Sequence, residues 1–179
     1  RRYTLGHPFG RSTRSRLAGP PDMCGEDRTV SKQYDAPPAM EIDPSKDYTA
    51  TIKTSLGDIV IQLYAKSAPE TVNNFVFLAR EGFYDNTIFH RVIADFMAQG
   101  GDPTGTGMGG SELPNIRAEF TREAKFQRGT CGMARSGDPN SANSQFFIMF
   151  APAPNLDGQY TLWGQVVRGM EFVDQIKRG

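Results

Sequence analysis

The chain has 179 residues, 38% hydrophobic and 22% charged, which suits one globular domain with an ordinary apolar core. Its 20 basic residues balance its 20 acidic residues, so the charge gives no general reason to expect a nucleic-acid-binding protein. Nineteen glycines and 12 prolines favour many turns and short strands. Cys24 and Cys131 lie far apart without the spacing of a metal site, and we expect no disulfide between them.

Residues 1–43 form a leader without hydrophobic periodicity, interrupted by prolines and glycines. The first 20 residues carry five arginines and no acidic residue. We predict a disordered or extended basic leader with a proline-containing linker, or alternatively a targeting peptide, followed by a domain from residue 44 to 179. Since no apolar run approaches the roughly 18 residues of a membrane span, we expect a soluble protein. Its compartment stays open between the cytoplasm, which we favour, and an exported or organellar destination.

Regular hydrophobic patterns begin after the leader. Alternating apolar and polar residues at 48–53 and 59–64 predict a hairpin. Ser67-Ala-Pro-Glu70 then reads as a capping box with proline in the first helical turn. The apolar spacing that follows predicts an amphipathic helix that ends at Gly82.

The rest of the chain predicts five further strands and one short helix. The strands are expected at residues 87–93, 96–99, 130–134, 145–150 and 160–167, and the helix follows from Met170. Because the strands follow one another with few helices between them, an antiparallel barrel with helices over its ends fits better than an α/β fold. The glycine-rich and polar stretch at residues 100–130 is long for a loop in a compact domain, which favours a functional role.

Two motifs suggest chemistry that their surroundings do not support. Gly105-Thr-Gly107-Met-Gly-Gly110 matches a dinucleotide fingerprint, but the residues after it do not open a helix that could hold a pyrophosphate. His90 lacks a placed nucleophile or acid with which a hydrolase could be assembled, and we assign it a supporting role.

A pocket for an apolar group that carries a carbonyl is expected around Arg91. A guanidinium cannot act as a base and is costly to bury without a partner. Gln99 on the next strand offers an amide to orient Arg91, and a second amide recurs at Gln145. The apolar residues expected on the same concave face are Phe96, Met97, Phe147 and Leu156.

Six short motifs follow one another in the second half of the chain. They are Phe89-His-Arg91, Phe96-Met-Ala-Gln-Gly-Gly-Asp102, Met133-Ala-Arg135, Ser144-Gln-Phe-Phe-Ile148, Leu156-Asp-Gly158 and Gly164-Gln-Val166. In this order the chain from about Tyr48 onward resembles the cyclophilin family of peptidyl-prolyl cis-trans isomerases, its bacterial members most. The resemblance implies a mainly β fold, a closed antiparallel eight-stranded barrel capped by two helices, whose usual last strand is absent from this chain.

The resemblance also implies an enzyme that accelerates cis/trans rotation of Xaa-Pro peptide bonds and assists protein folding, without metal or cofactor. Arg91 is then the catalytic arginine. The implied substrate-binding residues are His90, Phe96, Met97, Gln99, Ala134, Arg135, Gln145, Phe147, Leu156 and Tyr160. The expected partners are proline-containing peptides and folding proteins, and the protein is expected to be a monomer. The alternative is a module that binds proline peptides, or a chaperone, in the same groove without turnover.

The chain departs from cyclosporin-sensitive relatives at two pocket positions. Asn155 stands where they hold a tryptophan, and Tyr160 stands where they hold a histidine. Trp163, the one tryptophan of the chain, lies three residues later and does not replace the missing one. We therefore expect weak cyclosporin binding and an intact catalytic arginine.

Overall fold

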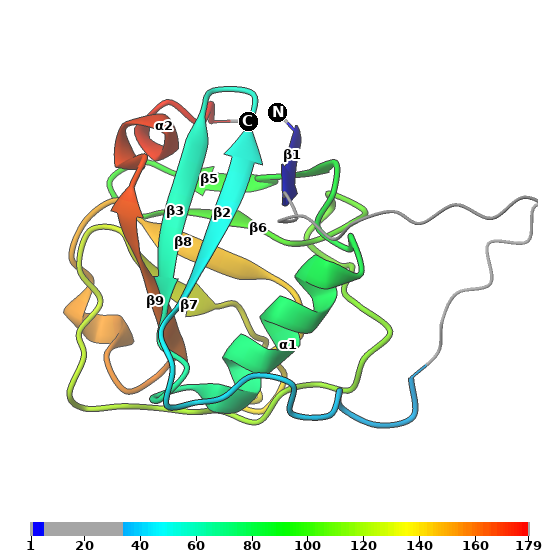
Figure 1. The fold of residues 1–179 in the computed structure, drawn as a ribbon. Helices are drawn as coiled ribbons and strands as arrows, with labels where there is room; N and C mark the ends of the chain where they lie inside the picture. The colour runs from blue at the N-terminus through cyan, green and yellow to red at the C-terminus, as the bar shows by residue number, and fades with distance from the viewer. Residues whose placement is uncertain (1, 6–33, 179) are drawn as a thin grey trace, which may run out of the picture.

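Nine antiparallel strands form one curved sheet in the computed structural model, which describes residues 2–5 and 34–178 (Figure 1). The strands are β1 Arg2–Leu5, β2 Tyr48–Thr54, β3 Asp58–Leu63, β4 Thr87–Ile88, β5 Arg91–Ile93, β6 Met97–Gly100, β7 Thr130–Met133, β8 Phe146–Met149 and β9 Leu162–Arg168. Their order across the sheet is β4-β1-β2-β3-β9-β7-β8-β6-β5. The predicted hairpin is confirmed as β2 and β3, which pair from Tyr48 opposite Leu63 to Lys53 opposite Asp58.

The predicted closed barrel of eight strands is wrong, because the sheet is open at β4 and β5. The stretch 87–93, predicted as one strand, breaks at Phe89 and His90 into these two strands. β4 pairs with β1, whereas β5 pairs with β6. The two edges of the curled sheet are therefore joined by the backbone of Phe89 and His90 and not by a ladder of hydrogen bonds.

The strand β1 was not predicted, because it lies in the leader. Its backbone pairs with β2, Tyr3 opposite Thr54, and with β4, Tyr3 opposite Thr87. It thus fills the sheet position between these strands (Figure 1). Residues 6–33 lie outside the described part of the chain, and the division of the chain at residue 43 stays a prediction.

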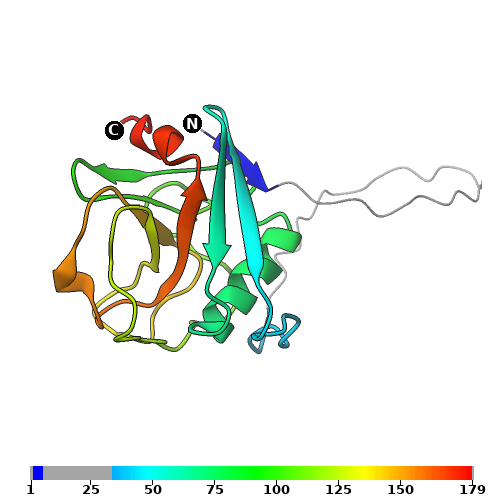
Figure 2. The same cartoon turned by 60° about the vertical axis from the view of Figure 1, so that its left-hand side comes forward.

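Two α-helices lie at opposite ends of the curled sheet, as Figure 2 shows. They are α1 Pro69–Arg80 and α2 Met170–Asp174, and a short 3-10 helix, η1, spans Pro154–Leu156. The mainly β class with two helices is confirmed. In the described residues no helix has the length and apolar character needed to cross a membrane.

The N-terminus of α1 is capped by a distant residue and not by the predicted capping box. The N-cap is Ala68, which makes no side-chain cap. Instead, the carboxylate of Glu119 accepts hydrogen bonds from the backbone N–H of Glu70 at 3.0 Å and of Thr71 at 2.9 Å. A carboxylate there satisfies unpaired donors and complements the helix dipole. The loop between β6 and β7 is thereby tied to the helix.

The main core is aromatic and lies between α1 and the sheet. Phe75 of α1 packs on Trp163 of β9, with ring centroids 4.6 Å apart, and edge-on against Phe146 of β8 at 6.0 Å. Tyr84, after the helix, packs against Phe75 at 5.1 Å. These four side chains are almost fully buried, so the amphipathic face predicted for the helix meets the concave side of the sheet.

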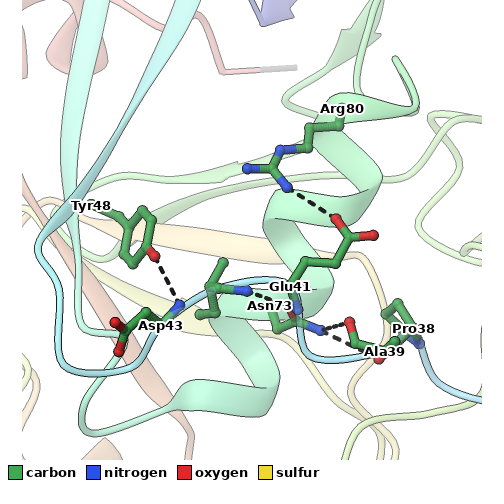
Figure 3. A network of polar contacts seen from close by, with 8 residues as sticks. Pro38, Ala39, Glu41, Asp43, Tyr48, Asn73 and Arg80 are labelled. Carbon is green, nitrogen blue, oxygen red and sulfur yellow. Dashed lines mark hydrogen bonds and ion pairs between the residues drawn. The ribbon is translucent and has the colours of Figure 1, made fainter.

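The side chain of Asn73 on α1 binds the backbone of residues 38–42 (Figure 3). Its Oδ1 accepts from the backbone N–H of Glu41 at 2.9 Å, and its Nδ2 donates to the carbonyl of Ala39 at 3.0 Å. Ile42 enters the core with 5% of its surface exposed, and Arg80 forms an exposed ion pair with Glu41 at 3.0 Å. This end of the predicted linker is therefore extended and packed on the domain.

We expect Asn73→Ala to lower the free energy of unfolding by about 2 kcal/mol, because it leaves partly buried backbone groups, and the backbone N–H of the buried Ile42, without this partner. Urea unfolding measures this loss, and limited proteolysis should cut the variant within residues 34–43. Arg80→Gln is the matched control, since an exposed ion pair contributes about 0.5 kcal/mol or less. An Asn73→Ala variant as stable as the control would contradict this account.

Candidate active site

A cavity of about 160 Å³ lies where β5, β6, β8 and the loops after β7 and β8 meet. Side chains alternate between the two faces of β8. Phe146 and Ile148 face the main core, whereas Phe147 and Met149 face a second apolar cluster beside the cavity. The residues that line the cavity are Arg91, Phe96, Met97, Gln99, Ala134, Arg135, Phe147, Leu156 and Tyr160. All nine were predicted as site residues from the sequence. The charged side chains in this lining are two arginines, without an acid.

Arg91 is exposed on β5 directly opposite Gln99 of β6, so both side chains lie on one face of the sheet. Its Nη1 donates to Oε1 of Gln99 at 3.4 Å, a long contact. Gln99 Nε2 in turn donates to Oε1 of Gln145 at 2.8 Å. Nε2 of Gln145 donates to the carbonyls of Gly107 at 3.0 Å and Gly109 at 2.8 Å. Two amides therefore connect the guanidinium to the glycine-rich loop.

The glycine-rich loop is folded around the buried carboxylate of Asp102. The carboxylate accepts from the backbone N–H of Thr104 at 2.8 Å, Gly107 at 2.6 Å and Gly109 at 3.1 Å. Gly107 has a φ of +86°, and a Cβ at Gly109 would collide with the carboxylate. The motif that matches a dinucleotide fingerprint is thus a loop built around an internal anion. Burial raises the pKa of Asp102. The hydrogen bonds from Thr104, Gly109 and Gly107 outweigh this effect and lower the pKa to about 2.

His90 does not line the cavity, although it was predicted to bind substrate. Its ring lies beside Gly107, whose Cβ would be 3.5 Å from Nε2. Both ring nitrogens are buried, and neither has a hydrogen-bond partner among the described residues. Burial lowers the pKa of His90, with the carboxylate of Asp102 acting in the opposite direction. The imidazole therefore packs beside the glycine-rich loop at Gly107.

Gln145 lies in a second hollow, of about 430 Å³, that adjoins the cavity through Gln99, Ala134 and Arg135. The sequence analysis predicted a functional role for the loop at 100–130 and named Gln99, Ala134, Arg135 and Gln145, but it did not identify the other residues that line this hollow. They are Gly107, Met108, Gly109, Gly110, Asn115, Ser136, Ser141 and Asn143. The spacing of Asn143 and Gln145 could have suggested one of them, because alternate residues of an extended chain share a face.

Comparisons with known proteins agree with this geometry. Residues 49–179 match the family model described as cyclophilin type peptidyl-prolyl cis-trans isomerase/CLD. A peptidyl-prolyl cis-trans isomerase of Arabidopsis thaliana is 46% identical over 129 residues, covering 70% of this chain and 78% of that protein. A probable peptidyl-prolyl cis-trans isomerase of Brucella suis is 48% identical over 152 residues, covering 79% and 76%.

A solved structure is similar over most of its length. It is a cyclophilin type peptidyl-prolyl cis-trans isomerase of Cryptosporidium parvum, determined in the presence of the dipeptide Ala-Pro. The TM-score is 0.69 at 38% sequence identity, and the match covers 72% of this chain and 84% of that one.

We expect Asp102→Asn to lower the free energy of unfolding by about 2 kcal/mol at neutral pH, because an amide cannot accept from all these donors. The pKa of Asp102 falls from 3.8 to about 2 on folding, so its contribution is complete above pH 3.8 and lost below about pH 2. Urea unfolding from pH 7 to pH 2 should therefore show the two proteins converging as the pH falls. Asp47→Asn, at an exposed carboxyl, should match the wild type throughout. A gap that stays constant with pH would refute the assignment to Asp102.

Proposed function

The chain belongs to the family of cyclophilin-type peptidyl-prolyl cis-trans isomerases, and we propose that it binds and rotates Xaa-Pro bonds in the cavity beside Arg91. Its activity is peptidyl-prolyl cis-trans isomerisation. One observation carries the location: the exposed guanidinium of Arg91 and a group of apolar side chains line the same cavity of about 160 Å³. Such a site offers apolar contacts to a proline ring and a strong donor beside it.

The reaction needs no nucleophile. Rotation about an Xaa-Pro bond faces an amide-resonance barrier of about 18 to 20 kcal/mol and takes tens to hundreds of seconds unaided. An enzyme lowers this barrier by binding the twisted amide better than either planar form. Each tenfold acceleration requires about 1.36 kcal/mol, so an acceleration of about 10⁴ to 10⁵ requires about 5.5 to 7 kcal/mol of preferential binding to the twisted amide.

The residues of the cavity suit this task by their positions. In the twisted amide the proline nitrogen becomes pyramidal and regains its lone pair, which can accept a hydrogen bond from Arg91. Phe96, Met97, Phe147 and Leu156 hold the ring while the preceding carbonyl turns. The bound peptide covers the cavity and shields this hydrogen bond from water, which strengthens the interaction with the guanidinium. Gln99, fixed by Gln145, keeps Arg91 over the cavity.

The substrates are proline-containing peptides and folding proteins. The relative from Cryptosporidium parvum was solved in the presence of Ala-Pro, a dipeptide of this kind. Residues before the proline would lie toward the second hollow, bordered by Ala134, Arg135 and Gln145. We propose that the domain works as a monomer, because a small single domain of this type needs no partner to form its site.

We expect Arg91→Ala to lower kcat/KM by about 10² to 10³, the usual loss when one preorganised donor to a transition state is removed. NMR exchange on a short Phe-Pro peptide measures the rate, and circular dichroism checks the fold. Arg168→Ala, which removes another exposed strand arginine, is the matched control and should keep full activity. Near wild-type turnover by Arg91→Ala would reject the catalytic role of this residue.

We expect weak cyclosporin binding, because Asn155 offers no large apolar surface beside Leu156 in η1. Asn155→Trp should tighten binding about tenfold, since a tryptophan adds apolar contact area at the edge of the cavity. Calorimetric titration of both proteins measures the difference. Tight binding by the wild-type chain would show that this position does not control the affinity.

A further inference from the structure

We propose that Arg135 is a positioning residue of the isomerase, which holds the ring of Tyr160 as a fixed wall of the proline cavity. The proposal rests on the proposed location of the active site. The guanidinium carbon of Arg135 lies 4.5 Å from the centroid of the Tyr160 ring, the geometry of a cation–π contact. Both side chains line the cavity.

The donors of Arg135 are used inside the protein. Nε and Nη2 both donate to the carbonyl of Gln159, at 3.1 and 2.8 Å, and Nη1 donates to the carbonyl of Ser136 at 2.9 Å. The guanidinium therefore ties the segment after β7 to the segment before β9. A planar fork can make these bonds and still stack on the ring, whereas a lysine ammonium cannot. This arrangement leaves Arg135 poorly placed to bind substrate with the same N–H groups.

Tyr160 is the outer member of a row of aromatic rings. It packs edge-on against Phe147, with centroids 5.8 Å apart at 83°, and Phe147 stacks on Phe126 at 5.8 Å and 29°. Phe126 is 1% exposed, and its backbone N–H donates to Asp157 at 2.8 Å. The inner end of the row is thus fixed by the core. Arg135 covers the outer end, where Tyr160 is partly exposed.

A wall that is ordered before the peptide arrives lowers the conformational entropy lost on binding. The wall contacts the proline ring, which keeps its place while the preceding carbonyl turns. It should therefore stabilise the planar and twisted amides to a similar degree. Uniform binding of this kind changes KM and Kd but leaves kcat nearly unchanged. A change in KM and Kd at constant kcat would distinguish the role of Arg135 from that of Arg91, whose loss should lower kcat.

The test measures kcat and KM by NMR exchange, and Kd by calorimetry, with a short Phe-Pro peptide. Arg135→Gln should raise KM and Kd by about fivefold, with kcat within about twofold of wild type, consistent with loss of a cation–π contact and an ordered wall. The KM and Kd of Arg135→Lys should lie between those of the wild type and of Arg135→Gln, because lysine keeps a cation near the ring. Arg80→Gln, on the outer end of α1, should leave all three constants unchanged.

The coupling to Tyr160 provides the decisive comparison. In a Tyr160→Leu background, Arg135→Gln should change KM and Kd by less than about twofold, because the ring it orders is gone. An equal rise in both backgrounds, no rise in the wild-type background, or a fall in kcat alone would overturn the proposal. Trp163 fluorescence checks the fold of each variant, and Arg135→Lys decides the question if Arg135→Gln is unfolded. A wild type that binds the peptide without turning it over would reject the proposed function, while the Kd comparison would still test Arg135.

Discussion

The buried carboxylate of Asp102 is the constraint on which the site depends. A charge removed from water must be satisfied by donors, and here the donors are backbone N–H groups of the glycine-rich loop. Once the loop wraps the carboxylate, the carbonyls of Gly107 and Gly109 point to Gln145 and fix its amide. Gln145 then fixes Gln99, which contacts Arg91. The position of an exposed guanidinium is in this way set by a buried anion.

Strand register brings this chain of amide hydrogen bonds beside the apolar side chains of the cavity. Gln99 stands opposite Arg91 on one side and opposite Phe147 on the other, because β6 lies between β5 and β8. A slip of one residue between β6 and β8 would turn Phe147 toward the main core and Phe146 toward the cavity. The aromatic contacts of Phe146 with Phe75 and Trp163 oppose that slip. The main core and the site are therefore specified by the same alternation along β8.

Local sequence patterns predicted most of the strands and the main helix, because alternation is a local signal. They also predicted Arg91, Gln99 and the apolar residues of the cavity, whereas Ala134, Arg135 and Tyr160 were implied by the family resemblance. They failed where distant residues decide the outcome. Glu119 caps α1 in place of Ser67, and Asn73 binds the backbone of residues 38–42, contacts that no window of neighbouring residues contains. The family resemblance placed His90 in the groove, and that role stays a prediction; its ring lies beside Gly107. The open sheet also depends on a break at Phe89 and His90 that propensity does not mark.

The two arginines of the cavity have the same chemistry but differ in how many of their donors are already used. Arg91 makes one long contact to Gln99 among the described residues, so most of its N–H groups can turn to a new acceptor. Arg135 has its Nε, Nη1 and Nη2 on backbone carbonyls and its flat face on Tyr160. A donor that meets its acceptor only in the twisted amide favours the transition state, whereas a donor spent on the protein can act only through the wall it holds. The difference between catalysis and affinity at this site thus follows from hydrogen-bond partners and not from residue type.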